Sequence, residues 1–133
     1  MRQLSEAHIE RTITGYLQLD GWRALKTNPT SNRARGKGFG EIGMADVLYL
    51  RYSSHKSVVA GASSIFQVEL LWAEFKRITT QGRTTKAAPH QREWHERERA
   101  RGAATLIVGE DCPATVEGIQ DWYRNSGLRR LVR

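Results

Sequence analysis

The stretch that decides the fold is Ile65-Phe-Gln-Val-Glu-Leu-Leu-Trp-Ala-Glu-Phe-Lys76. It is typical of a buried β-strand that ends in two opposite charges, Glu74 and Lys76. Because side chains alternate faces along a strand, both charged side chains project to the same side. Upstream, Asp46 opens a second apolar run, Val47-Leu-Tyr-Leu50. If the two strands are neighbours, two carboxylates and one ammonium group converge at their ends, where they can hold a hard divalent cation and steady a phosphate.

The length and composition of the chain are those of one globular domain over residues 1–133. Hydrophobic residues make up 39% and charged residues 26%, which is typical of a folded protein rather than a disordered one. Lys and Arg exceed Asp and Glu to leave a net charge of +7. This excess favours polyanionic partners, nucleic acid first among them, and the alternative is a basic surface kept for solubility.

The sequence carries one cysteine, Cys112, which excludes an internal disulfide or a cysteine-based zinc site. The four histidines are scattered, and His90 and His95 are five residues apart, a poor match to a zinc-binding helix. No apolar run approaches 18 residues and the N-terminus lacks the apolar core of a signal peptide. We therefore expect a cytoplasmic protein with no membrane segment.

Hydrophobic periodicity and turn residues predict three helices and four strands. The order is helix 5–19, strand 22–26, strand 47–52, strand 65–76, helix 89–101, strand 103–108 and helix 113–123. Residues 53–64 are interpreted as a hairpin excursion or a surface loop. The order predicts an α/β fold with a mixed central β-sheet flanked by helices.

Two basic loops, residues 27–43 and 77–88, separate these elements. Long loops inside a compact domain often carry function, and here the expected function is contact with nucleic-acid phosphates. A solvated basic loop is the alternative. The candidate nucleic-acid-binding residues are Arg33, Arg35, Lys37, Arg77, Arg83 and Lys86.

The charged strand ends have the chemistry that phosphodiester cleavage requires. Asp46 and Glu74 supply the carboxylate oxygens that Mg²⁺ or Mn²⁺ prefers, and the carbonyl of Phe75 is a third candidate ligand. Lys76 would orient the attacking water or offset charge on the phosphate. The alternative is an ordinary salt-bridged pair at a strand end.

Two further polar residues lie in first turns of predicted helices. Glu6 begins the first helix, where an acid also favours the helix dipole. Gln91 follows Pro89, a residue tolerated at the start of a helix, and its functional role would be to touch a phosphate or a metal-bound water.

Several of these motifs resemble those of the VRR-NUC domain, a branch of the PD-(D/E)XK nuclease superfamily. They are Gly43-Met-Ala-Asp46, Ala73-Glu-Phe-Lys76, Pro89-His-Gln-Arg-Glu-Trp94, Ala100-Arg-Gly-Ala103 and the opening Ser5-Glu-Ala-His-Ile9 through Gly21-Trp22. The resemblance spans nearly the whole chain and is that of a stand-alone protein of the bacterial or phage type. It departs from the family at Ala45, where proline is usual, and in a longer insert between Tyr52 and Ile65.

The resemblance implies a restriction-endonuclease-like core and a metal-dependent nuclease. Asp46 and Glu74 would be the metal ligands, Lys76 the catalytic lysine, and Gln91 and Glu6 the auxiliary polar residues. Glu10 competes with Glu6, which is preferred because its spacing to Ile9 matches the family pattern. The resemblance also implies a DNA substrate, branched DNA included, a homodimer, and a location in the bacterial or phage-infected host cytoplasm.

Two other hypotheses stand beside this one. The first is a non-catalytic DNA-binding module that retains the nuclease fold. The second is an α/β protein of another function whose strand-end charges are structural.

Overall fold

A computed structural model describes residues 5–27, 40–55, 65–76 and 87–130 of the chain, and all structural statements concern these ranges. Three helices and four strands lie within them. The elements are α1 (Glu6–Leu19), β1 (Arg23–Lys26), β2 (Val47–His55), β3 (Ile65–Glu74), α2 (Pro89–Ala100), β4 (Ala104–Ile107) and α3 (Val116–Asn125). None of the helices in these ranges has the length and apolar character needed to cross a membrane.

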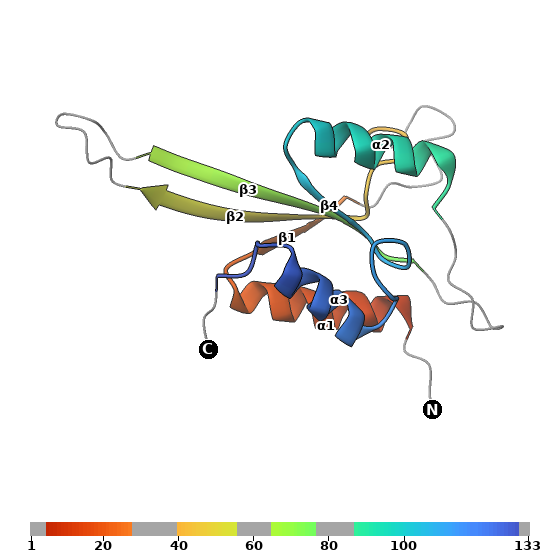
Figure 1. The fold of residues 1–133 in the computed structure, drawn as a ribbon, viewed down its shortest axis with the longest axis horizontal. Helices are drawn as coiled ribbons and strands as arrows, with labels where there is room; N and C mark the ends of the chain where they lie inside the picture. The colour runs from red at the N-terminus through yellow and green to blue at the C-terminus, as the bar shows by residue number, and fades with distance from the viewer. Residues whose placement is uncertain (1–4, 28–39, 56–64, 77–86, 131–133) are drawn as a thin grey trace.

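The four strands form one mixed sheet in the order β1-β2-β3-β4. β1 and β3 both run antiparallel to β2, whereas β4 runs parallel to β3. Figure 1 shows α2 on one face of this sheet and α1 with α3 on the other. The predicted α/β fold, with a mixed sheet flanked by helices, is therefore confirmed.

The alternation of side chains along the central strands builds a separate core on each face. Tyr49 of β2 and Leu71 of β3 are both buried on the face covered by α1 and α3, where Ile13 packs against them. Trp72 points to the other face and contacts Trp94 of α2 edge-on, with ring centroids 4.9 Å apart. This period-two pattern lets one hydrophobic strand serve both helix layers.

Local signals in the sequence place the helix ends. The Ser5 hydroxyl accepts a hydrogen bond from the His8 amide at 3.2 Å and caps α1 as expected. Pro89 opens α2, and Gly102 follows the helix with φ +102°. The last helix begins at Val116 rather than at the predicted Pro113, because the Thr115 side chain caps the amide of Gly118.

Two strand ends differ from the prediction. β2 does not stop at Tyr52, since its pairing with β3 continues to His55 opposite Ile65. Residues 53–55 therefore belong to the sheet, and the rest of the 53–64 insert lies outside the described residues. β3 ends at Glu74 instead of Lys76. Figure 1 shows the β2–β3 pair extending well beyond the helices as an arm.

Candidate metal centre

The acidic and basic residues predicted at the strand ends come together beneath the first turn of α2. The ammonium group of Lys76 donates to Glu74 Oε1 at 2.9 Å and to Gln91 Oε1 at 2.7 Å. The Gln91 amide in turn donates to the same Glu74 oxygen at 2.8 Å. These three side chains form a closed triangle of hydrogen bonds, in which each residue orients the other two.

Asp46 lies at the same end of the β2–β3 pair. Val47 is opposite Ala73 in the sheet, so Asp46 and Glu74 are the next residues along their two chains. The Asp46 Oδ2 atom accepts a hydrogen bond from the backbone amide of Phe75 at 3.2 Å. The geometric expectation that the two carboxylates share one end and one face of the sheet therefore holds.

Burial makes the Glu74 carboxylate hard to ionise. Its side chain is buried, and this desolvation, together with the negative charge of Asp46, raises the pKa of Glu74 to about 7. The contact with Lys76 lowers the pKa and so offsets part of this rise. Burial likewise raises the pKa of Asp46, which the amide of Phe75 and the charge of Lys76 partly offset. A cation would bind favourably beside these two acids, because its positive charge would stabilise their ionised carboxylates.

One oxygen of this pair has no described partner with the geometry of a hydrogen bond. Glu74 Oε2 is buried and has no partner with hydrogen-bond geometry there, whereas Oε1 accepts two hydrogen bonds. The backbone amide of Asp46 approaches the Glu74 carboxylate closely enough to lower its pKa, but it does not complete a hydrogen bond to Oε2. A buried carboxylate oxygen without a donor is costly unless a cation or water satisfies it. The donor set of Asp46, Glu74 and the Phe75 carbonyl therefore fits a hard divalent ion such as Mg²⁺, which binds few carboxylates and keeps several waters.

The described side chains do not form a metal site with more protein ligands than this pair. Within the described ranges, no group of three or more His, Cys, Asp or Glu side chains is arranged to hold an ion. A metal at the Asp46–Glu74 pair would thus rely on these two carboxylates, backbone oxygen and solvent.

The turn that delivers Asp46 is held against α2 by a close backbone contact. Gly43 has φ +85°, and a Cβ atom placed on it would lie 2.3 Å from the carbonyl oxygen of His90. Only glycine fits there. Next to it, the Trp94 indole donates to Glu41 Oε2 at 2.8 Å and ties the same turn to α2.

The charge of Glu10, the alternative acid of the first helix, reaches the carboxylate pair. The charge of Glu10 contributes to raising the pKa of Asp46, and its carboxylate forms a 3.0 Å ion pair with Lys26 of β1. Glu6, the acid preferred from the sequence, is the first residue of α1 and half-buried. Glu10 is therefore within electrostatic reach of Asp46, and the role of Glu6 stays a prediction.

His95 was not expected near this centre. It is 1% exposed, and neither ring nitrogen has a hydrogen-bond partner among the described residues. Burial, then the positive charges of Arg99 and Lys76, lower its pKa to about 4, so the ring is neutral. The signal in the sequence was its position four residues after Gln91, which places both on one face of α2.

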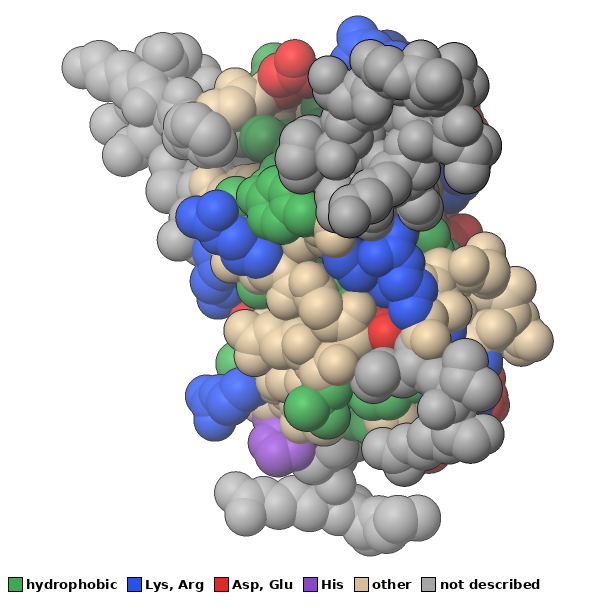
Figure 2. Space-filling view, turned by 90° about the vertical axis from the view of Figure 1, so that its left-hand side faces the viewer, with side chains coloured by type: hydrophobic (Ala, Val, Ile, Leu, Met, Phe, Trp, Pro, Cys, Tyr) green, Lys and Arg blue, Asp and Glu red, His purple; other side chains and the backbone are tan. Residues whose placement is uncertain are grey.

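The six basic residues proposed to bind nucleic acid lie outside the described residues. Arg33, Arg35 and Lys37 fall in 28–39, and Arg77, Arg83 and Lys86 fall in 77–86. Basic character is also present on the described surface. Figure 2 looks at the molecule from the side of the β2–β3 arm, and blue side chains cover more of the described surface in this view than red ones.

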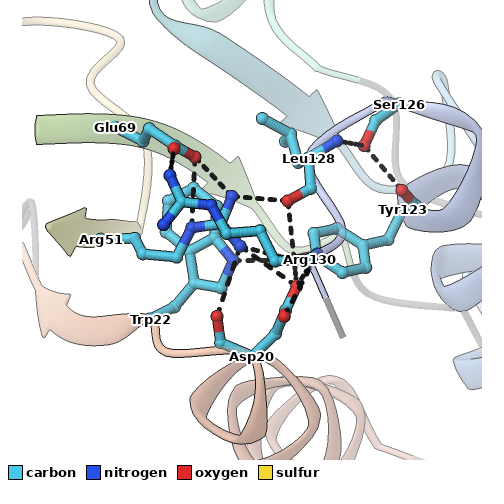
Figure 3. A network of polar contacts seen from close by, with 8 residues as sticks. All are labelled: Asp20, Trp22, Arg51, Glu69, Tyr123, Ser126, Leu128 and Arg130. Carbon is cyan, nitrogen blue, oxygen red and sulfur yellow. Dashed lines mark hydrogen bonds and ion pairs between the residues drawn. The ribbon is translucent and has the colours of Figure 1, made fainter. Parts of the chain in front are cut away.

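A second polar cluster, which the sequence analysis missed, centres on Arg51. Figure 3 shows its guanidinium between Asp20 and Glu69, with the Tyr123 hydroxyl and the Leu128 carbonyl nearby. Arg51 has a side-chain exposure of 4% and stacks 4.3 Å from the centre of the Trp22 ring. Because these donors and acceptors satisfy one another, we assign the cluster to stability.

The chain was compared with family models, with curated proteins and with solved structures, and no match was found in any of the three.

Proposed function

We propose that the protein is a Mg²⁺- or Mn²⁺-dependent endonuclease that hydrolyses phosphodiester bonds of DNA, branched DNA included, on a restriction-endonuclease-like core. The observation that carries the proposal is the state of Glu74. Its carboxylate is buried beside Asp46, has one oxygen without a donor among the described residues, and is positioned by Lys76 and Gln91. The resemblance of these motifs to VRR-NUC nucleases supports the same reading.

Each residue would have a separate task. Asp46 and Glu74 would hold the cation, with the Phe75 carbonyl as a third ligand. A divalent cation there would supply polarisation of the scissile phosphate and acidification of the attacking water. Lys76 would bind that water or the non-bridging phosphate oxygen, because its ammonium group is already directed to the Glu74 side of the site.

The reaction joins water oxygen to phosphorus and breaks the bond from phosphorus to the leaving oxygen, which takes up a proton. Gln91 holds the side chains of Lys76 and Glu74 in position through its two hydrogen bonds. Glu10, in electrostatic reach of Asp46, would act as the auxiliary acid of the first helix. The basic residues of 28–39 and 77–86 would supply affinity for the DNA backbone, which should weaken as salt rises.

The test is a cleavage assay with linear, flap, splayed and four-way DNA in Mg²⁺ or Mn²⁺. Wild type should cut at least one of these DNAs and Glu74→Ala should cut none. Glu96→Ala is the matched control, because Glu96 is an exposed acid of α2 away from the pair. Cleavage by Glu74→Ala at the wild-type rate would contradict the proposal, and binding without product by wild type would favour the non-catalytic DNA-binding module.

A further inference from the structure

His95 is a buried histidine whose ring makes no hydrogen bond to any described residue. The residue is 1% exposed, and both ring nitrogens lack a partner there. Burying a polar group without a hydrogen bond costs free energy, and most buried polar atoms in folded proteins do have a partner. An apolar side chain at this position of α2 would be buried without that cost. The histidine therefore points to a role other than packing.

The spacing along α2 places His95 beside the candidate metal centre. One stripe of the helix carries Gln91, His95 and Arg99, each four residues after the last. At one end of the stripe, Gln91 donates to Glu74 of β3 at 2.8 Å. At the other end, Arg99 donates to Thr105 of β4 at 2.6 Å. His95 therefore lies between these two contacts, where α2 covers the sheet (Figure 1).

The same layer between α2 and the sheet holds the ammonium group of Lys76. Trp72 packs against α2, and Glu74 lies on the same face of β3 because it is two residues further along. Lys76 donates to Glu74 Oε1 and so reaches into this layer, where its side chain is 9% exposed. The pKa of His95 is lowered first by burial and then by the positive charges of Arg99 and Lys76. Lys76 is thus within electrostatic reach of the ring.

Lys76 and His95 have complementary hydrogen-bonding groups to spare. An ammonium group has three N–H donors, and the described contacts of Lys76 use two, to Glu74 and to Gln91. A neutral imidazole has one acceptor nitrogen, which in His95 has no partner among the described residues. No direct hydrogen bond joins the two groups in the described ranges. A link between them therefore needs a small bridging molecule, and water is the usual one.

We propose that His95 is a positioning residue that holds the ammonium group of Lys76 through a bridging water. The water accepts from the third N–H of Lys76 and donates to the acceptor nitrogen of His95. Gln91 and this water then fix two of the three N–H groups, and the third stays directed to the Glu74 side of the site. The effect on cleavage rests on the proposed nuclease function, in which that third N–H meets the attacking water or the phosphate.

The first test is the steady-state cleavage of DNA by variants of the full chain. His95→Phe keeps a planar ring in the core but removes both nitrogens. Its kcat should fall roughly 10- to 100-fold, with KM for DNA unchanged, because the ring itself touches no substrate. His95→Gln restores an acceptor and should recover most of the lost rate. His8→Phe is the matched control, since it makes the same change at an exposed histidine of α1 and should cut as wild type does.

The second test follows Lys76 itself, in the absence of DNA and metal. Exposed lysine ammonium groups exchange their protons rapidly with water, whereas a buried and fully hydrogen-bonded one exchanges slowly enough to give a ¹⁵N-resolved NMR signal. Wild type should show such a signal, assigned to Lys76 by its loss in Lys76→Met. We expect the signal to be lost in His95→Phe and retained in His95→Gln.

The outcomes separate this inference from the proposed function. A Lys76 ammonium signal that survives in His95→Phe would overturn the role of His95, and so would the absence of the signal from wild type. Cleavage by His95→Phe at the wild-type rate would overturn it as well, as would a loss of rate that His95→Gln fails to recover. If wild type cuts no DNA, the proposed function fails, and the ammonium signal alone decides whether His95 positions Lys76.

Discussion

The Asp46 carboxylate accepts a hydrogen bond from the backbone amide of Phe75 at 3.2 Å, and this contact ends the ladder between β2 and β3. The side chain replaces the backbone acceptor that a longer β2 would have offered. As a result, the chain leaves the sheet just where Glu74 and Lys76 meet. The residue that terminates the pairing is also one of the two acids of the candidate metal centre.

The first prediction concerns stability against pH without metal. The pKa of Glu74 is raised from 4.5 to about 7 in the folded protein, so the folded state binds an extra proton between these values. Stability from this group is therefore lost as pH rises from about 4.5 to 7, by about 3 kcal/mol. Glu74→Gln should remove the loss, and denaturant unfolding at pH 5 and pH 8 measures it.

The shifted pKa of His95 changes stability with pH in the opposite direction to that of Glu74. Wild type must therefore be compared with Glu74→Gln at each pH. The pKa of His95 is lowered to about 4 from 6.5, so its contribution to stability rises over that interval. The difference between wild type and Glu74→Gln isolates Glu74. Equal differences at pH 5 and pH 8 would contradict the raised pKa.

The second prediction concerns metal. Mg²⁺ should raise the melting temperature of wild type at pH 8, because it binds the ionised carboxylates of the folded state. It should have little effect at pH 5, where Glu74 is protonated. Differential scanning fluorimetry with and without Mg²⁺ is the measurement, with Glu74→Gln as the control that should not respond.

The third prediction separates the two acids of the first helix. Glu10→Gln should reduce cleavage, because it removes a negative charge near Asp46 that would attract the cation, even though it also lowers the pKa of Asp46. Glu6→Gln should have the smaller effect. Cleavage rates as a function of Mg²⁺ concentration compare the two variants, and a larger loss in Glu6→Gln would support Glu6 as the auxiliary acid.

The fourth prediction uses two glycines with similar backbone angles. Gly43→Ala should destabilise the protein by well over 2 kcal/mol and disturb the metal centre, because the added Cβ meets the His90 carbonyl. Gly102→Ala, at φ +102° with no atom within 4 Å of the added Cβ, should cost only about 1–2 kcal/mol. Urea unfolding of both variants measures the difference, and equal losses would argue against the close contact.

The fifth prediction concerns the Arg51 cluster. Tyr123→Phe removes a hydroxyl that accepts from the Trp22 indole and contacts Asp20, and it should cost about 1–3 kcal/mol. Tyr49→Phe, which loses one half-buried contact with Thr14, should cost about 1 kcal/mol. Thermal unfolding of the two variants tests the ranking, which the reverse order would refute.

Local and periodic features of the fold could be read from the sequence. Ser5, Pro89 and Gly102 mark helix ends by their own chemistry, and alternation along residues 65–74 marks a strand. The convergence of Glu74 and Lys76 followed from the same alternation. These predictions depend only on neighbours a few residues away.

Contacts between distant residues could not be read in this way. Arg51 reads as an exposed strand residue until Asp20 and Tyr123, far apart in the chain, are seen to surround it. Sequence spacing also does not show which turn of α1 lies near Asp46, so the effect of Glu10 on this carboxylate could not be predicted. Likewise, β2 continues past Tyr52 because β3 offers it a partner, and not because residues 53–55 favour a strand.

The Arg51 cluster has a consequence for the protein during its synthesis. The acceptors that surround the buried guanidinium include Tyr123 and Leu128, and the backbone amide of Arg130 closes on Asp20 beside them. Until these residues have left the ribosome, burying Arg51 would leave its charge short of acceptors. The sheet and α1 should therefore reach their final packing only once residues up to Arg130 have left the ribosome, in one late step rather than progressively.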